Sequence, residues 1–278
     1  MTTIVFLSIL GAALLHASWN AIIKIGGNKL SGMAIMTLVQ GCFGVMVIAT
    51  RPLPQGEVWL WLLGSGLFHS AYKVFLAYAY EQGDLSRVYP IARGAAPMVV
   101  MGIGAVFLSD VISGFEYIGI VVLGGGILAM AQGVFASGES RRLVPLALGS
   151  AMATAGYSLV DGLGARVMGD AISYVGWLFI FDALIFTPVS IALGGLTVFR
   201  GNLAAWGYGS LAAAGSYGAY AIAVWAMTVA PIALVAALRE TSILFAVLMG
   251  WILFGERMSR GKMFAVVLIV AGVVLTRI

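Results

Sequence analysis

The sequence predicts an all-α membrane protein, with ten transmembrane helices arranged as two inverted five-helix repeats around a central cavity. Of its 278 residues, 62% are hydrophobic and 9% are charged, whereas soluble domains carry about 25% charged residues. Ten apolar stretches follow one another, each near the ~20 residues that a helix needs to cross a bilayer. Residues also match between the halves at a constant offset, as Arg93 and Arg239 do.

The first half divides into five helices at clusters of polar, glycine or proline residues. Its first apolar stretch lacks the basic start and the cleavage site of a signal peptide, so we expect a transmembrane helix there. The predicted helices are 3–24, ended by 26–31; 32–50, ended by 51–57; 57–80, ended by 81–87; 86–108, ended by 109–114; and 115–136, ended by 137–142. Pro90 and Pro97 each remove a backbone donor from the fourth helix, which predicts a kink, either static or part of a moving element.

The second half divides in the same way. Its predicted helices are 143–161, ended by 161–170; 171–194, ended by 195–202; 203–227, ended by 228–231; 231–254, ended by 255–262; and 261–277. The first and third of these are rich in glycine and alanine, which lets membrane helices approach closely. These boundaries place Asp161 at a helix end.

Composition and motifs exclude several classes of function. The net charge is +4, but the basic residues are scattered singly, so nucleic-acid binding is not indicated. The chain lacks the phosphate-binding loop of ATP-driven proteins and the His-Glu-x-x-His motif of membrane metalloproteases. Intramembrane aspartyl catalysis needs two facing acids, and Asp161 and Asp182 are poor candidates because Asp161 ends a helix. We expect no enzyme, no catalytic residue, no metal and no cofactor.

The internal repeat gives the two sets of five helices opposite orientations. Arg93 aligns with Arg239, and Gly126 aligns with Gly272. Because five is odd, the second half enters the membrane in the opposite sense to the first. Many secondary transporters are built on such inverted repeats, with the substrate site near the bilayer midplane. We divide the chain into residues 1–138 and 139–278.

Ionisable residues deep within apolar stretches indicate where a functional site lies. A charge at membrane depth costs about 2.5–3.5 kcal/mol on insertion scales, so such residues usually face a bundle interior or a water-filled cavity. The residues in question are His16, His69, Lys73, Arg93, Arg239 and Glu240.

The chain resembles the EamA branch of the drug/metabolite transporter superfamily over its whole length. Residues 89–97 with 107–110, and residues 237–242 with 253–257, carry the resemblance, since each half has a Leu-x-Gly-Glu-like turn before a glycine-rich final helix. Two departures matter: Ser109–Asp110 stands where the family usually has Gly-Glu, and Glu240–Thr241 stands where many members carry a helix-breaking proline. Members of this family export amino acids, metabolites and drugs, or carry sugar derivatives.

The resemblance implies that the first, third, fourth, sixth, eighth and ninth helices surround the cavity. Polar stripes on these helices agree with that arrangement, as where His16 and Asn20 share one helix face. The candidate substrate-binding residues are His16, Trp19, Asn20, His69, Tyr72, Lys73, Tyr89, Arg93, Tyr157, Tyr217, Tyr220, Arg239 and Glu240.

Each candidate has a chemical role and a structural alternative. Arg93 and Arg239 suit bidentate binding of a carboxylate or phosphate, although Arg93 could instead pair with an acid or with freed backbone carbonyls. The two histidines could be polar contacts for substrate or hydrogen-bonded core residues. Glu240 and Asp182 are the proton-coupling candidates, because a buried carboxyl group takes up a proton more readily than an exposed one.

Two criteria disagree on membrane orientation. If the amino terminus is inside, the inner loops carry three basic residues and the outer loops carry nine, which contradicts the positive-inside rule. The resemblance implies cytoplasmic termini, and we adopt that arrangement as a working hypothesis. Ten crossings place both termini on one side in either case.

These observations predict a secondary transporter of the bacterial inner (plasma) membrane that works by alternating access. We expect it to export a small polar or zwitterionic metabolite such as an amino acid or a carboxylate-rich derivative. The alternatives are a flippase for a lipid or lipid-linked sugar, and a multidrug or cation exporter. Expected partners are the small-molecule substrate, the lipid bilayer and protons as coupling ion, in a monomer or homodimer.

Overall fold

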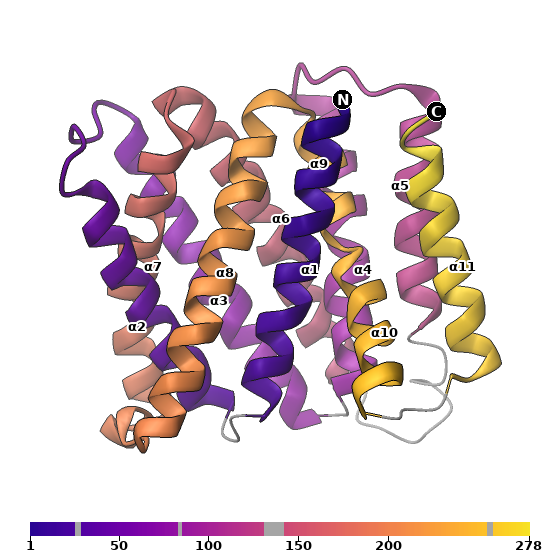
Figure 1. The fold of residues 1–278 in the computed structure, drawn as a ribbon. Coiled ribbons are helices and arrows are strands. Elements are labelled where there is room, and N and C mark those ends of the chain that lie inside the picture. The colour runs from indigo at the N-terminus through magenta and orange to yellow at the C-terminus, as the bar shows by residue number, and fades with distance from the viewer. Residues whose placement is uncertain (26–28, 83–84, 131–141, 255–257) are drawn as a thin grey trace.

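The computed structural model describes residues 1–25, 29–82, 85–130, 142–254 and 258–278, and the regular structure in these segments is helical. Figure 1 shows the helices side by side, with both termini at the same end of the bundle, as an even number of crossings requires. The elements are α1 (Thr3–Ile25), α2 (Lys29–Ile48), α3 (Val58–Gln82), α4 (Leu85–Phe107), α5 (Gly114–Ala129), α6 (Leu143–Met168), α7 (Ala171–Gly194), the 3-10 turn η1 (Leu196–Phe199), α8 (Leu203–Val229), α9 (Ile232–Arg239), α10 (Ser242–Phe254) and α11 (Arg260–Leu275).

The predicted helix 231–254 is interrupted, so that α9 and α10 together make one crossing. At the break, the amides of Glu240 and Thr241 bond to carbonyls three residues back rather than four, and the Thr241 hydroxyl donates to the Leu238 carbonyl at 2.7 Å. Tight turns and a side-chain hydroxyl thus end α9 without a proline. The prediction of one continuous helix over this range was wrong.

The predicted end of a helix at residue 161 was also wrong, because α6 continues to Met168. It ends at Gly169, whose φ of +73° favours glycine, and Asp170 then caps α7 by accepting from the amides of Ile172 and Ser173. The polar residues around Asp161 are not a loop. They form a buried polar face in the middle of a long helix.

Two prolines do not divide α4, which runs unbroken from Leu85 to Phe107. Whether this helix moves during function stays a prediction. The break predicted at 109–114 is confirmed, since Ser113 caps α5 in a reciprocal capping box with Glu116. The predicted end of that helix, near residue 136, lies outside the described residues.

Matching helices from the two halves pack against each other through small residues. A β-carbon on Gly126 of α5 would lie 3.0 Å from the amide nitrogen of Ile269, and one on Gly272 of α11 would lie 2.6 Å from that of Leu123. These two glycines align in the repeat, so the α5–α11 contact is symmetric. Such close backbone approach is how membrane helices associate without a hydrophobic drive.

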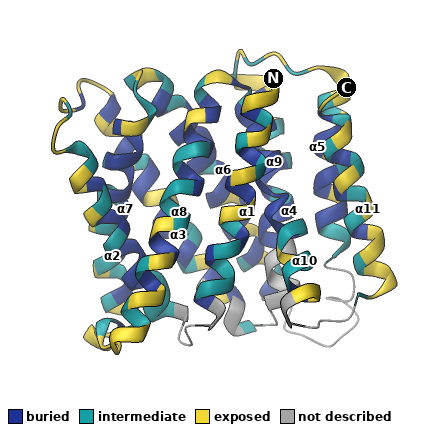
Figure 2. Ribbon diagram, viewed as in Figure 1, coloured by how far each residue is buried: buried dark blue, intermediate teal, exposed yellow. Residues whose placement is uncertain are grey.

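Apolar side chains cover the outside of the bundle, and its interior holds apolar, small and polar side chains together. Figure 2 shows the exposed residues on the outer faces and the buried ones toward the interior. Leu60, Phe107, Leu184 and Leu203 are among the large hydrophobic residues that face outward. Within the segments that the structure describes, six are long and apolar enough to cross a bilayer, as expected of a multi-pass membrane protein.

Candidate functional site

Within the described segments, two buried ion pairs and one buried histidine–aspartate pair join the two halves of the protein. In each pair, the base comes from the first half and the acid from the second. The pairs are Arg93 Nε–Glu240 Oε2 at 2.7 Å, Lys73 Nζ–Asp182 Oδ2 at 2.6 Å and His69 Nε2–Asp161 Oδ2 at 3.0 Å. Removing one partner of such a pair leaves an uncompensated buried charge, so each pair holds the halves together.

The Arg93–Glu240 pair ties α4 to the break between α9 and α10. Glu240 follows directly after α9, and its carboxylate turns toward Arg93 on α4. Of the two roles foreseen for Arg93, pairing with an acid is the one realised in this conformation. The same arginine also lines a cavity, so it lies at the edge of the site.

The Lys73–Asp182 pair lies among α2, α3 and α7. Lys73 also donates to the Thr37 hydroxyl at 2.8 Å, and its ammonium lies 4.5 Å from the centre of the Phe186 ring. Asp182 lies on α7, a helix predicted to be peripheral, but its side chain is buried and paired with Lys73. Lys73 does not line either of the cavities described below.

The third pair is the centre of a larger polar network that the sequence analysis missed. Asp161 accepts hydrogen bonds from the hydroxyls of Tyr174, at 3.3 Å, and Tyr220, in addition to its contact with His69. The His69 ring stacks on Tyr157, with ring centres 4.2 Å apart. The polar stripe on α6 pointed to Asp161, but the wrongly placed helix end removed it from the candidates.

Two small cavities meet at His16 on α1. The first is lined by Ala12, Ala13, His16, Ala219, Tyr220 and Arg239, and the second by His16, Trp19, Asn20, Met33, Tyr72, Leu76, Ala92, Arg93 and Ser150. They measure about 10 and 30 Å³, and one water needs roughly 10–15 Å³. This conformation is therefore closed around the site, with room for one or two waters.

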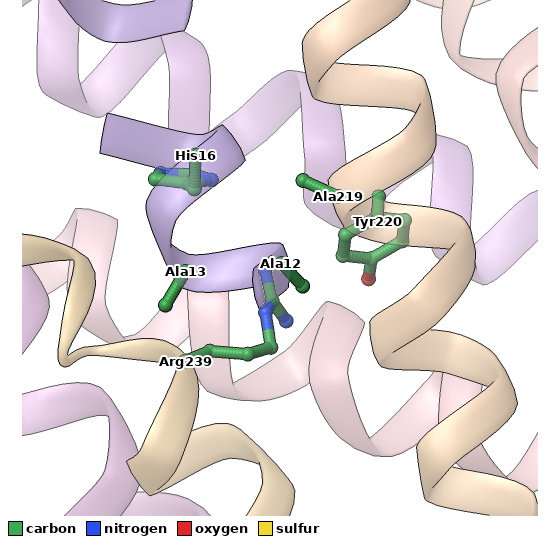
Figure 3. Close-up of a pocket in the computed structure, with 6 residues that line it drawn as sticks. All are labelled: Ala12, Ala13, His16, Ala219, Tyr220 and Arg239. Atoms are coloured by element: carbon green, nitrogen blue, oxygen red, sulfur yellow. The ribbon is translucent and has the colours of Figure 1, made fainter. Parts of the chain in front are cut away.

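Arg239 differs from the other buried bases because, within the described part of the chain, no acid forms a hydrogen bond with it; the neighbouring Glu240 carboxylate pairs with Arg93 instead. Its side chain reaches from α9 toward Ala12, with Tyr220 across the cavity (Figure 3). The guanidinium lies 4.8 Å from the centre of the Tyr220 ring, a cation–π distance. Arg239 is only 7% exposed, and its guanidinium makes no hydrogen bond or ion pair with the described residues.

His16 and its neighbours form the polar wall between the cavities. The indole nitrogen of Trp19 donates to His16 Nδ1 at 3.3 Å, and the Asn20 amide donates to the His16 carbonyl at 2.8 Å. These bonds fix one ring nitrogen of His16 as an acceptor, and the imidazole lines both cavities. The three residues predicted from one helix face therefore contact one another, and their role in substrate binding stays a prediction.

The structure brings seven of the predicted substrate-binding residues to the cavities, and the others differ in where they lie. Lys73, His69 and Glu240 belong to ion pairs, and Tyr157 supports His69. Tyr217 packs on Phe43 and Phe179, away from both cavities. The Tyr89 side chain lies outside the described residues. The seven cavity residues are His16, Trp19, Asn20, Tyr72, Arg93, Tyr220 and Arg239.

Comparison with protein families agrees with the paired halves. The profile of the EamA-like transporter family matches residues 3–132 and again residues 142–278. The chain belongs to the EamA-like transporter family. It is thus a multi-pass membrane transporter with a small-molecule substrate, and not an enzyme. The division at residues 138 and 139 falls outside the described residues and stays a prediction.

Solved structures support the EamA fold assignment. One crystal structure of a protein matches with a TM-score of 0.79 and 17% sequence identity, covering 100% of this chain and 99% of the other. At that identity, the likeness concerns the fold alone. A search among curated proteins finds no match.

One departure from the family pattern has a structural role in this EamA protein. Asp110, in the position usually held by glutamate, accepts two hydrogen bonds from Arg166, at 2.7 and 3.2 Å, and one from the amide of Ile232 at 2.8 Å. Arg166 also donates to the carbonyls of Met227 and Ala230. The Asp110–Arg166 pair thus links α6 to the start of α9, at the end of the bundle where both chain termini lie.

Proposed function

We propose that this protein is a secondary transporter of the bacterial inner membrane that works by alternating access. It exports small polar or zwitterionic metabolites, such as amino acids or carboxylate-rich derivatives. The observation that carries the proposal is Arg239, a buried arginine that faces the cavity with no acidic partner among the described residues.

A buried guanidinium without a counter-charge is costly, so such a group usually serves a ligand. A substrate carboxylate would complete it, because guanidinium presents a planar fork of donors that matches the two carboxylate oxygens. His16 and Asn20 would add hydrogen bonds, and Trp19 and Tyr220 would pack against the apolar part of the substrate.

Alternating access fits the closed state of the cavity. A space for one or two waters has to widen before a metabolite enters, and the interrupted crossing at Glu240 lies beside it. In inverted-repeat transporters, one repeat rocks against the other around a fixed site. The ion pairs between the halves would rearrange during that motion. Proton coupling and a monomeric or homodimeric state belong to the same proposal.

The test is a thermal-stability screen of the detergent-purified protein. The ligands are amino acids, dipeptides, sugar phosphates, nucleosides, quaternary amines and lysolipids. The proposal expects an amino or carboxylic acid to raise the unfolding temperature, because a ligand that binds the native state stabilises it. The shift should vanish in Arg239→Ala and persist in Arg200→Ala, whose arginine is exposed at the end of η1.

A different pattern would overturn the proposal. Shifts with quaternary amines or lysolipids alone, unchanged by Arg239→Ala, would mean that the arginine is structural. A multidrug exporter or a lipid flippase would then be the better description. Uptake into proteoliposomes that contain the parent protein, followed with the radiolabelled hit, converts binding into transport.

A further inference from the structure

We propose that His69 and Asp161 form a proton-binding site that is linked to the cavity through Tyr220. The proposal rests on the proposed transport function only for its role in coupling, and the site itself is testable without any substrate. Neither the fold nor the family assigns a proton site to these residues. Their geometry does so in three steps.

The three buried pairs differ in how readily their members can exchange a proton. An arginine stays protonated in proteins, so a proton taken up by Glu240 would leave the buried charge of Arg93 uncompensated. Lys73 is held by Asp182, Thr37 and the Phe186 ring. Histidine is the side chain whose ordinary charge change falls between pH 5 and 8. Of the three bases, His69 is therefore suited to exchange a proton under physiological conditions.

The second step is the surroundings of Asp161, which is fully buried. Its carboxylate contacts groups from three other helices: His69 on α3, Tyr174 on α7 and Tyr220 on α8. Each hydroxyl is a neutral donor, so a neutral His69 leaves one negative charge in this cluster. Uptake of a proton turns the pair into imidazolium and carboxylate, which compensate each other.

Other charged groups near the pair are already assigned. Lys73 lies one turn along α3 and is neutralised by Asp182 on α7. Arg239 on α9 stacks on the Tyr220 ring, and His16 on α1 lines the cavity opposite it. Arg239 is thus the cation in contact with the group that donates to Asp161.

The third step is the link to substrate. Tyr220 joins the two sites, because its hydroxyl donates to Asp161 while its ring carries the Arg239 guanidinium. With the pair deprotonated, the Asp161 charge offsets that of Arg239 and weakens its hold on an added carboxylate. Protonation removes this competition, so a proton and a carboxylate favour each other's binding, and the effect is reciprocal. The direction of net flux then depends on both gradients together.

The experiment follows His69 by nuclear magnetic resonance of protein labelled with ¹⁵N-histidine. The chain has two histidines, so His16→Gln leaves a single imidazole signal. In that background, the His69 signal should change from that of a neutral imidazole to that of a charged one as the pH is lowered. In Asp161→Asn, it should stay neutral throughout, because a buried imidazolium would lose its counter-charge.

Further variants test the link and the choice of partner. Tyr220→Phe and Arg239→Gln should each displace the midpoint of the His69 titration, since one removes the connecting hydroxyl and the other the cavity charge. Asp170→Asn is the control, an acid of the second half that pairs with Arg51 at a solvent-exposed site, and it should leave the midpoint in place. Tyr220→Phe also serves as the decisive variant if Asp161→Asn does not fold.

Two results would overturn the proposal. One is a His69 signal that does not change with pH, and the other is a signal that changes alike with and without the Asp161 carboxylate. Failure of the transport proposal looks different. In that case His69 still titrates with Asp161, while no amino or carboxylic acid stabilises the protein through Arg239. Conversely, a ligand could raise the unfolding temperature only when Arg239 is present, while the His69 signal does not change with pH. That result would support the transport proposal and contradict the proton site.

Discussion

Arg93 and Arg239 occupy equivalent positions in the two halves, but Arg93 is paired with Glu240 and Arg239 faces the cavity. Glu240 follows Arg239 in the chain, yet adjacent side chains on a helix point about 100° apart, so it reaches across to Arg93 instead. The repeat supplies two arginines and one carboxylate at this level. One arginine is paired with that carboxylate, and the other lines the cavity.

Replacing Glu240 with glutamine should destabilise the protein strongly. The change leaves Arg93 without its carboxylate in a buried site, and breaking such pairs costs about 3–5 kcal/mol. Thermal unfolding in detergent measures the effect. The double variant with Arg93→Met should recover part of the loss, because it removes the orphaned charge. Glu57→Gln is the control, since Glu57 is exposed. Equal stability of Glu240→Gln and the parent would contradict a structural role for this pair.

Two neighbouring glycines of α5 offer a test of the symmetric α5–α11 contact. A β-carbon on Gly126 would come within 2.9 Å of the Leu268 side chain, whereas one on Gly125 would meet nothing within 4 Å. Gly126→Ala should therefore cost about 1–3 kcal/mol from overpacking, and Gly125→Ala should be neutral. Unfolding temperatures of the two variants give the comparison directly. Equal losses in the two variants would contradict the assignment of the cost to the close contact at Gly126.

The apolar stretches and the repeat were readable from the sequence, because helix length and hydropathy are local properties. The partners of the buried charges were not, since His69 and Asp161 are 92 residues apart and Arg93 and Glu240 are 147 apart. Polar residues also led to a wrong helix boundary in the second half. Around Asp161 they looked like a loop, because hydropathy does not distinguish a surface turn from a polar face buried against other helices.

The ion pair of Arg51 with Asp170, outside the membrane-spanning helices, predicts a dependence of stability on pH. Burial alone would raise the pKa of the Asp170 carboxyl, but hydrogen bonds from Ser173 and Arg51 outweigh it and hold the pKa below its ordinary value. A lowered folded-state pKa stabilises the protein above the unfolded value of about 3.9, and this contribution disappears as the pH falls through the folded value.

The stability difference between the parent and Asp170→Asn should accordingly be present at neutral pH and shrink below about pH 4. This stability difference should be modest, because the side chains of Arg51 and Asp170 are 34% and 38% exposed and solvent screens the pair. Thermal unfolding of both proteins across this pH range gives the difference. Ser173→Ala should reduce it in part, and a gap that widened on acidification would show the sign to be wrong.

Asp110 provides the last test, because its carboxylate joins the start of α9 to Arg166 at the terminal end of the bundle. Asp110→Asn keeps an acceptor for the Ile232 amide but loses the charge that Arg166 binds, and hydrogen bonds to charged groups contribute about 1.5–3 kcal/mol. We expect a loss in this range by thermal unfolding. Asp110→Glu restores the residue type usual in the family and keeps the charge, but its extra methylene moves the carboxylate away from the Ile232 amide. The stability of Asp110→Glu should fall between that of the parent protein and that of Asp110→Asn. A glutamate variant less stable than the asparagine variant would mean that the geometry at Ile232, and not the charge opposite Arg166, dominates this end of the protein.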